Sequence, residues 1–453
     1  MKHYDLIVLG WGKAGKTLAG KYASHGKKVA IIERDPKMYG GTCINVGCLP
    51  TKSLVHSAGL IDEVRHLGLA TDWSFNEKAY ALAMARKKEV IAKLNQKNFN
   101  LLNDNPNVDV YNGEGKFIAN KQIQVNNDIL TAEHIVINTG SHSHVLPIKG
   151  ADSAHVVDSR ALLELESLPR RLLIIGAGFI GLEFASYFAN FGSQVDVFQF
   201  NEEFVPSEDA DVQDEIKKVL EAKGITFHFN TSAHEFVDQG DKVMVRYASN
   251  GVAAEQVYDK VLISAGRLPN TQNLGLENTD IRLGKRGEIL VDEHLRTGVP
   301  NVFAVGDVKG GAFFTYISLD DSRIVLPQLL GEQGARTMNN RGIFATTTFI
   351  NPPYARVGEN EKTATAKGIT YTVKKGLSAA VPKAHLIAKT EGFTKLLFDE
   401  SQVLIGAQVF NYEAHENINF FTLAIKQKLT LADLRDAIYT HPIYLESLND
   451  FLG

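Results

Sequence analysis

The chain has 453 residues, of which 44% are hydrophobic and 22% charged, and its formal net charge is −4. This length exceeds one ordinary hydrophobic core, so two or three domains are expected. A nucleic-acid-binding protein is not expected, because the sequence has no basic stripe and no run of five like charges. The N-terminus runs directly into an apolar strand pattern without signal-peptide features, which predicts a cytoplasmic protein without a membrane partner.

Residues 8–33 read as a strand, a glycine-rich turn, a helix and a second strand. Gly10, Gly12 and Gly15 have the GxGxxG spacing of dinucleotide-binding folds. The first glycine permits the tight turn, the second lets a pyrophosphate approach, and the third lets the helix pack on the strand. N–H groups at the helix start then bind the phosphates. Glu33 ends the second strand, where a carboxylate accepts hydrogen bonds from a ribose.

Residues 40–50, GGTCINVGCLP, hold the only cysteines, Cys43 and Cys48. In a regular helix, residues five apart are about 7.5 Å apart along the axis, whereas a disulfide needs Cα atoms within about 7 Å. A bridge would therefore need an irregular turn, which the intervening asparagine and glycine can supply. Pro50 is tolerated in a helix's first turn, so Cys48 is expected near a helix N-terminus, which favours thiolate.

Three interpretations of this cysteine pair remain open. In a reducing cytosol, a lone pair is typically catalytic or metal-binding. Two inert buried thiols are an alternative, because most free cysteines are buried. A zinc site would need two further ligands, and no Cys/His cluster lies nearby in the sequence.

The middle of the chain continues the alternation of strands and helices. Residues 79–103 are expected to form a helix, and HIVINTGS (134–141) a strand that ends at a glycine turn. The apolar segment 172–192 is long enough to suggest a membrane helix. However, it contains Glu183 and four glycines, so a buried strand, a glycine turn and a packed helix fit it better.

This segment repeats the first unit. Gly176, Gly178 and Gly181 follow the glycines of the first motif by 166 positions, and Gln199 stands at the offset of Glu33. A second dinucleotide, a nicotinamide one, is therefore expected here. Gln199 leaves the choice between NADH and NADPH open. No Arg or Lys follows it closely to hold a 2′-phosphate, which slightly favours NADH.

The remaining sequence contains two more strand-and-turn motifs and then changes texture. VLISAGRLPN (261–270) and NVFAVGDV (301–308) each read as a strand that meets a glycine turn. From about residue 340, alternating strands are followed by helices, which predicts a separate α+β domain.

These motifs together carry a family resemblance. With GGTCINVGCLPTK, two dinucleotide folds, AGRLPN, FAVGDV and HPIYLE, the chain resembles the two-cysteine flavoprotein disulfide reductases, the class I pyridine nucleotide-disulfide oxidoreductases. That family includes dihydrolipoamide dehydrogenase, glutathione reductase and mercuric reductase. The resemblance covers the whole chain. MYGGTCINVGC, FTYISLDDSRIV and HPIYLESLND are most similar to the reactive-chlorine-resistance branch, whose members look like copper(II) reductases.

The resemblance implies an α/β fold with two doubly wound, Rossmann-like dinucleotide-binding domains and a C-terminal α+β dimerisation domain. The implied domains are an FAD-binding domain (1–145), an NAD(P)H-binding domain (146–266), a second FAD-binding or central segment (267–338) and the dimerisation domain (339–453).

The resemblance also implies an electron path. NAD(P)H reduces FAD, and electrons pass through Cys48, the sulfur nearer the flavin, to Cys43, which meets the substrate. Lys52 and Glu183 match an ion pair beside the flavin.

The C-terminal motif implies an obligate homodimer. His441 and Glu446 match a base and its orienting carboxylate, which in relatives come from the other subunit. Ile443 replaces the usual Thr after His-Pro, and no further cysteine exists for a C-terminal relay. Phe179 stands where many relatives have a Tyr beside the nicotinamide.

The resemblance implies more cofactor contacts than the glycine motifs alone. Asp307 matches an aspartate that contacts the ribityl region of the flavin. The FAD contacts are Gly10, Gly12, Gly15, Glu33, Gly41, Thr42, Lys52, Gly115, Thr139, Gly140, Arg267, Gly306 and Asp307. The NAD(P)H contacts are Gly176, Gly178, Phe179, Ile180, Gly181, Gln199 and Gly266.

The leading hypothesis is a flavoprotein that reduces a metal ion such as copper(II) in oxidative or chlorine stress, with Cys43 and Cys48 as transient metal ligands. Thiolates are soft donors suited to copper, and an exposed thiol of low pKa is easily oxidised. One alternative is a dihydrolipoamide dehydrogenase or glutathione-type reductase of small disulfides. The other is a flavin-bound redox sensor or complex subunit without sustained turnover.

Overall fold

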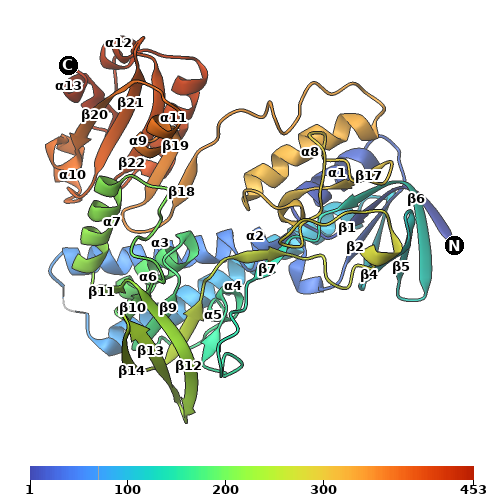
Figure 1. Ribbon diagram of the computed structural model, residues 1–453, viewed down its shortest axis with the longest axis horizontal. Helices are drawn as coiled ribbons and strands as arrows, with labels where there is room; N and C mark the ends of the chain where they lie inside the picture. The colour runs from blue at the N-terminus through green and yellow to red at the C-terminus, as the bar shows by residue number, and fades with distance from the viewer. Residues whose placement is uncertain (70) are drawn as a thin grey trace.

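The first glycine-rich unit forms the end of the molecule that carries the N-terminus (Figure 1). In the computed structural model, which describes residues 1–69 and 71–453, β1 (Lys2–Leu9) lies parallel between β2 (Val29–Glu33) and β6 (Asp128–Ile137). The strand is apolar on both faces because both faces are covered. The other elements of this unit are α1 (Lys13–Ala23), β3 (Val108–Asn112), β4 (Gly115–Ala119), β5 (Gln122–Val125), β17 (Val302–Ala304) and α8 (Thr315–Leu329).

The sheet of this unit is assembled from distant segments of the chain. Its order is β3-β2-β1-β6-β5-β4, and β17 pairs with β6 in parallel. α1 and α8 cover one face, where Leu6 and Val8 are buried. The opposite face buries Ile7 and Leu9 against the segment that precedes β17. The chain thus returns to its first sheet after passing through a second one.

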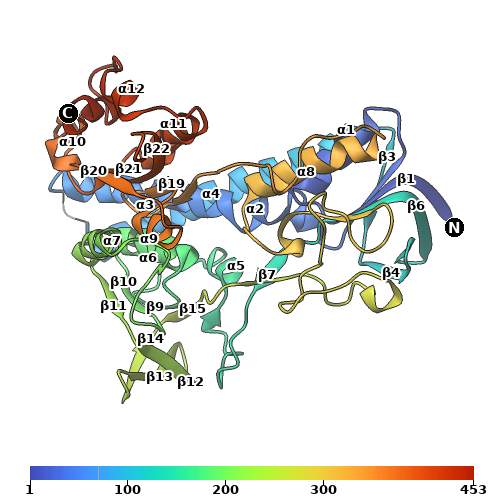
Figure 2. The same cartoon turned by 45° about the horizontal axis from the view of Figure 1, so that its top comes forward.

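Helices α2 (Gly41–Asn45) and α3 (Cys48–His66) carry the chain from the first sheet toward the rest of the molecule, and α4 (Trp73–Asn103) leads it back to β3 (Figures 1 and 2). α4 spans about 46 Å at the rise of an α-helix. The helix predicted at 79–103 begins earlier, at Trp73, because the Asp72 side chain caps it by accepting a 2.7 Å hydrogen bond from the Phe75 N–H.

The second glycine-rich unit repeats the topology of the first. β9 (Arg171–Ile175) leads through the glycine turn into α6 (Phe179–Phe191), so the apolar segment 172–192 is a buried strand, a turn and a helix. The parallel sheet has the order β11-β10-β9-β15-β8, and an antiparallel sheet of β12, β13 and β14 packs on it. The remaining bounds are β8 (Val156–Val157), α5 (Ser159–Leu162), β10 (Gln194–Phe198), α7 (Ala210–Ala222), β11 (Ile225–His228), β12 (Thr231–Gln239), β13 (Lys242–Ser249), β14 (Val252–Tyr258) and β15 (Lys260–Ile263).

Two short antiparallel strands, β7 (Ser141–Ser143) and β16 (Arg267–Pro269), cross together between these two units. The C-terminal region, at the upper left of Figure 1, is an antiparallel sheet of order β18-β19-β22-β21-β20 with α11 packed on it. Its elements are β18 (Thr346–Thr348), β19 (Tyr354–Gly358), α9 (Glu361–Ala366), β20 (Tyr371–Leu377), α10 (Pro382–Leu386), β21 (Phe393–Asp399), β22 (Leu404–Phe410), α11 (Ala414–Lys426), α12 (Leu431–Arg435) and α13 (Leu448–Phe451). The protein therefore has the expected α/β class.

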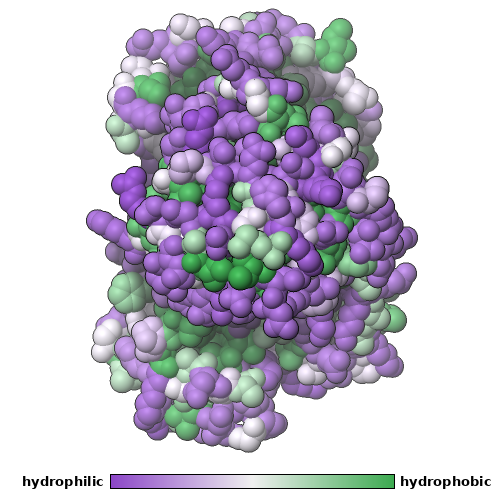
Figure 3. Space-filling view, turned by 90° about the vertical axis from the view of Figure 1, so that its right-hand side faces the viewer, coloured by the Kyte–Doolittle hydropathy of each residue, from purple (hydrophilic) through white to green (hydrophobic). Residues whose placement is uncertain are grey.

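The surface at the N-terminal end is largely hydrophilic, with apolar groups gathered in patches and recesses (Figure 3). Within residues 1–69 and 71–453, no helix has the length and apolar character needed to cross a membrane.

Candidate active site

The two thiols lie on either side of a break between two helices. Cys43 belongs to the short helix α2, and Cys48 is the first residue of α3, as the sequence predicts. Between them, Val46 and Gly47 leave helical geometry, which provides the expected irregular turn. Both thiols are free and half-buried. The glycine-rich turn and the position of Pro50 within α3 therefore bring two reduced sulfurs together at a helix N-terminus.

A hydrogen bond joins the two sulfurs and separates their pKa values. The hydrogen bond from Cys48 is the main cause that lowers the pKa of Cys43 to about 6; burial opposes it, while Thr315, Lys16 and Lys52 add to it. The same hydrogen bond and burial raise the pKa of Cys48 well above its usual range, so the thiolate that the helix N-terminus is expected to favour at Cys48 is not favoured there. Near neutral pH the reduced pair thus carries one negative charge, which resides on Cys43.

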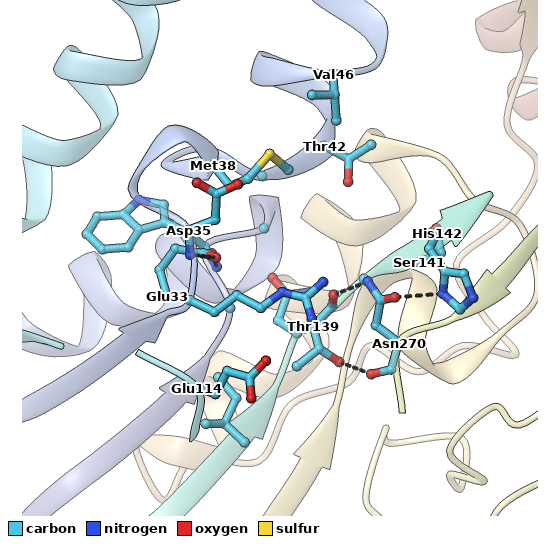
Figure 4. A pocket seen from close by; sticks show the side chains of 18 of the residues that line it. Glu33, Asp35, Met38, Thr42, Val46, Glu114, Thr139, Ser141, His142 and Asn270 are labelled. Atoms are coloured by element: carbon cyan, nitrogen blue, oxygen red, sulfur yellow. Dashed lines mark hydrogen bonds between the residues drawn. The ribbon is translucent and has the colours of Figure 1, made fainter. Parts of the chain in front are cut away.

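A cleft of about 430 Å³ lies along the first glycine motif (Figure 4). Glu33 and Asp35 stand on one side of it, and His142 and Asn270 on the other. Most of the residues expected to bind FAD line this cleft: Gly10, Gly12, Glu33, Gly41, Thr42, Gly115, Thr139, Gly140 and Arg267. The structure thus gathers residues from four distant segments of the chain around one cavity.

The other four expected FAD contacts, Gly15, Lys52, Gly306 and Asp307, are not among the lining residues. Conversely, the sequence motifs did not indicate several residues that do line the cleft, among them Asn138, Asp158, Ser159 and Asn270. The signal that could have indicated Asn138 is its place between a buried strand and the following Thr-Gly turn.

The shape of the glycine turn fits a pyrophosphate, as the sequence predicts. Gly10 has φ +95°, and a side chain on it would collide with the backbone of Asn138. The N–H groups of Ala14 and Gly15 are already bonded, to Ser318 Oγ (3.1 Å) and Asn138 Oδ1 (2.8 Å). These two N–H groups are therefore already occupied within the protein.

Glu33 is buried beside this turn. Its Oε2 accepts a 3.1 Å hydrogen bond from the Trp11 N–H. Burial raises the pKa of Glu33, and the backbone hydrogen bonds from Asp35 and Trp11 oppose that rise. The carboxylate thus orders the glycine turn and lines the cleft where a ribose is expected.

The second glycine unit has the same internal bond. Gln199 Oε1 accepts a 3.1 Å hydrogen bond from the Ala177 N–H, and Ala177 stands 166 positions after Trp11. An amide can therefore replace the carboxylate in holding the turn, although it brings no charge. Phe179 begins α6 and is 39% exposed, so its ring is accessible beside the second turn.

A hydrogen-bond chain connects three residues beside the cleft. Arg267 Nε donates to Ser141 Oγ (2.8 Å), and Ser141 Oγ donates to Asp307 Oδ2 (2.6 Å). Burial lowers the pKa of Arg267, and Asp307 opposes that shift. The chain fixes the orientation of the Asp307 carboxylate, whose predicted role is to contact the flavin's ribityl region.

The predicted pair of Lys52 and Glu183 is formed. Lys52 Nζ lies 2.8 Å and 2.6 Å from the two carboxylate oxygens of Glu183. The Phe349 N–H donates to Glu183 Oε1 (2.9 Å), and the Phe349 ring lies 4.6 Å from Lys52 Nζ. The pair thus joins α3, about a turn after Cys48, to α6 and to the residue that follows β18.

His441 and Glu446 also form their predicted pair, at a Nδ1–Oε2 distance of 2.7 Å. The His441 side chain is 70% exposed. The pair lies in the C-terminal region, which Figure 1 places away from α2. A single chain therefore does not bring this imidazole to its own thiols.

Two nucleotide-binding units, a cysteine pair and a C-terminal sheet define an oxidoreductase that uses two dinucleotides. The family model "Pyridine nucleotide-disulphide oxidoreductase" matches residues 4–326, and the dimerisation-domain model of the same family matches residues 344–451. The chain belongs to the pyridine nucleotide-disulphide oxidoreductase family, and its dimerisation domain makes it a homodimer.

Individual relatives agree with this assignment over the whole chain. The chain is 41% identical to the probable pyridine nucleotide-disulfide oxidoreductase RclA of Escherichia coli, covering 100% of this chain and 99% of the relative. It is 32% identical to mercuric reductase of Staphylococcus aureus (98% and 81% covered) and 31% identical to mitochondrial dihydrolipoyl dehydrogenase of Pisum sativum (98% and 90% covered). A structure described as the Cu(II) complex of the HOCl-induced flavoprotein disulfide reductase RclA from Escherichia coli aligns with a TM-score of 0.92 at 39% identity, covering 100% and 99% of the two chains.

FAD and NAD(P)H, both expected from the sequence, are the cofactors of this family. The residues present fit FAD: the cleft follows the first glycine turn, a Cβ at Gly10 would obstruct that turn, and the buried Glu33 carboxylate lies at its end.

Proposed function

We propose that the protein is an NAD(P)H-dependent reductase of copper(II), active in defence against oxidative or chlorine stress, and that Cys43 and Cys48 deliver the electrons. The observation that carries the proposal is the pair of adjacent free thiols with its charge on Cys43. Thiolates are soft ligands with high affinity for copper. The Cu(II) complex of the similar RclA protein supports the choice of metal.

The chemistry assigns different tasks to the two sulfurs. When bound in the cleft, FAD would supply the hydride chemistry that connects NAD(P)H with the Cys43–Cys48 disulfide. Cys48, first in α3, takes the position nearer the flavin, and Cys43 meets the metal. Two Cu(II) ions then each take one electron from the reduced pair, one thiol and one thiolate, which gives two Cu(I) ions, one disulfide and one released proton.

The ion pair with Glu183 holds the ammonium group of Lys52 close to the thiols. Lys52 lies about a turn from Cys48 on α3, and Lys52 and Glu183 alter the pKa of Cys48 in opposite directions. The proposed role of the pair is to balance charge beside the flavin while electrons move between the ring and the disulfide.

His441 is proposed to act across the homodimer. Because its imidazole is exposed and already oriented by Glu446, it is available to the thiols of a second subunit. There it holds or delivers the proton that the sulfurs exchange during each cycle. The active site is then shared between subunits.

Steady-state assays with copper(II), lipoamide and glutathione disulfide test the proposal. We expect copper reduction in the wild-type protein and its loss in Cys43→Ser and Cys48→Ser. Lipoamide turnover faster than copper reduction by orders of magnitude would refute it in favour of the dehydrogenase activity named for the Pisum sativum relative. Flavin reduction by NAD(P)H without turnover on any acceptor would instead identify a redox sensor.

A further inference from the structure

Asn138 stands at the point where three parallel strands of the first sheet end together. β6 lies between β1 and β17, and its last residue, Ile137, is level with Leu9 of β1 and with Ala304 of β17. From this edge β1 leads into the first glycine turn (residues 10–15), and β17 leads into a turn that carries Asp307, the aspartate turn (residues 306–309). Asn138, which follows β6, therefore lies between the two turns.

The side chain of Asn138 bonds to both of its neighbours. Its Oδ1 accepts a 2.8 Å hydrogen bond from the Gly15 N–H, and its Nδ2 donates a 2.8 Å hydrogen bond to the Val305 carbonyl, just before the aspartate turn. Asn138 is 5% exposed, so a partner that lost its bond would remain buried and unsatisfied. One amide group thus ties the start of α1 to the segment that follows β17.

Glycines of both turns pack against this amide. A Cβ added at Gly12 would collide with Asn138 Oδ1, and one at Gly15 would lie 2.9 Å from it. On the other side, a Cβ at Gly306 would lie 2.8 Å from Asn138 Nδ2. The missing side chains at these three positions therefore make room for the asparagine between the turns.

The strands themselves are held together without this side chain. The Asn138 N–H donates to the Leu9 carbonyl (2.8 Å), and the Val305 N–H donates to the Ile137 carbonyl (3.0 Å). The side-chain bonds act beyond these backbone bonds, on the two turns, and Asn138 also lines the cleft. Its position therefore relates to the cofactor site rather than to the sheet alone.

We infer that Asn138 is a positioning residue that couples the first glycine turn to the aspartate turn, so that the pyrophosphate and ribityl parts of FAD meet one pre-organised surface. The glycine turn is expected to bind the pyrophosphate, and Asp307 to contact the ribityl chain. Because both bonds lie within the protein, order in one turn supports order in the other, and less conformational freedom is lost when FAD binds. The inference concerns the cofactor and does not depend on the electron acceptor.

Competition binding to the full-length holoenzyme tests the coupling. The protein is equilibrated with graded FAD, with and without ADP as a competitor, and free flavin is read by fluorescence after ultrafiltration. ADP is the half of FAD that carries the pyrophosphate, so it reports on the glycine turn, whereas FAD reports on both turns. One buried hydrogen bond changes an equilibrium about fivefold, so in Asn138→Ala the dissociation constant should rise about fivefold for ADP and about twenty-five-fold for FAD. The control Asn411→Ala removes the same side chain from a buried site in the C-terminal region and should change neither constant.

A double-mutant cycle measures the same connection from the aspartate turn. Gly306→Ala places a methyl group against Asn138 Nδ2 and Ser318 Oγ. We expect it to raise the dissociation constant of ADP about fivefold, and we expect that rise to disappear in an Asn138→Ala background. Gly306→Ala leaves the asparagine in place, so it tests the inference even if Asn138→Ala does not fold. An unchanged ADP constant in Gly306→Ala refutes the coupling.

Three further results would overturn the inference. Equal rises for ADP and FAD in Asn138→Ala would assign the asparagine to the glycine turn alone. Unchanged constants with a lower melting temperature would leave it a role in stability only. A rise in Gly306→Ala that persists without Asn138 would make Ser318, whose Oγ accepts from the Ala14 N–H (3.1 Å), the connection instead.

Discussion

Replacing Thr315 with Val tests how the charge on Cys43 is maintained. Thr315 is the first residue of α8, and its side chain hydrogen-bonds the Cys43 sulfur and so helps to lower its pKa to about 6. Valine has the same shape without the hydroxyl group. A hydrogen bond to a charged group contributes about 1.5–3 kcal/mol, and one pKa unit corresponds to about 1.4 kcal/mol. Since Thr315 is half-buried, we expect the lower end of that range, a rise of the Cys43 pKa by about one unit.

The assay is the pH dependence of Cys43 alkylation by iodoacetamide in the reduced protein, followed by peptide mass. At pH 6 about half of Cys43 is thiolate in the wild type and about one tenth in Thr315→Val, so the variant should react about fivefold more slowly. At pH 9 both are fully ionised, and equal rates there show that access to the sulfur is unchanged. Identical profiles for the two proteins, or a wild-type midpoint near the ordinary thiol value of about 8.5, would refute the assigned charge on Cys43.

Three further predictions concern other regions of the molecule. Lys395 is 1% exposed and lies among three carboxylates. In urea unfolding, Lys395→Met should therefore lower the free energy of unfolding by about 3–5 kcal/mol. The control Lys375→Met, at a partly exposed ion pair, should lower it by less than about 1 kcal/mol. Burial raises the pKa of Asp211, but its bonds with Lys375 and Lys395 outweigh burial and lower that pKa. The stability contributed by the ionised Asp211 is therefore present at neutral pH and is lost as pH falls through its pKa. The difference in the free energy of unfolding between wild type and Lys395→Met should accordingly narrow below about pH 4. Gln199→Glu should lower kcat/KM for NADPH relative to NADH, because a carboxylate repels a 2′-phosphate; an unchanged ratio would place cofactor choice elsewhere. Glu183→Gln should slow flavin reduction in stopped-flow traces while the melting temperature changes little. A lower melting temperature with an unchanged rate of flavin reduction would contradict the role of Glu183 beside the flavin.

The sequence predicts the features of the site that depend on local pattern. The two glycine turns, Glu33 and Gln199 can be placed because each lies within one strand–turn–helix unit, where spacing fixes geometry. Cys48 can be placed at a helix start because Pro50 restricts the backbone before it. The separation of the helices at Gly47 follows from the same local constraints.

The features that the sequence does not reveal depend on contacts between distant segments. Asn98 accepts from Lys16 across 82 positions, and Asn138 accepts from Gly15 across 123 positions. Asn98 belongs to no motif, Asn138 stands in the predicted strand-and-turn segment 134–141 without any sign of its partner, and neither pairing has a spacing rule. Thr315 is adjacent to Cys43 only because α8 returns to the first sheet after the second unit.

Contacts from three separate helices, of which only α8 belongs to the returning segment, lower the pKa of Cys43. α2 alone would leave Cys43 an ordinary half-buried sulfur at the surface of the first sheet. Lys16 comes from α1, Lys52 from α3 and Thr315 from α8, and each of them lowers the pKa of Cys43. Because three separate helices contribute, a substitution in one of them should change the thiolate fraction of Cys43 only in part. The break between the two helices, which brings the sulfurs together, should stay intact. The reactivity of the outer sulfur can therefore vary among related sequences while the cysteine motif itself stays the same.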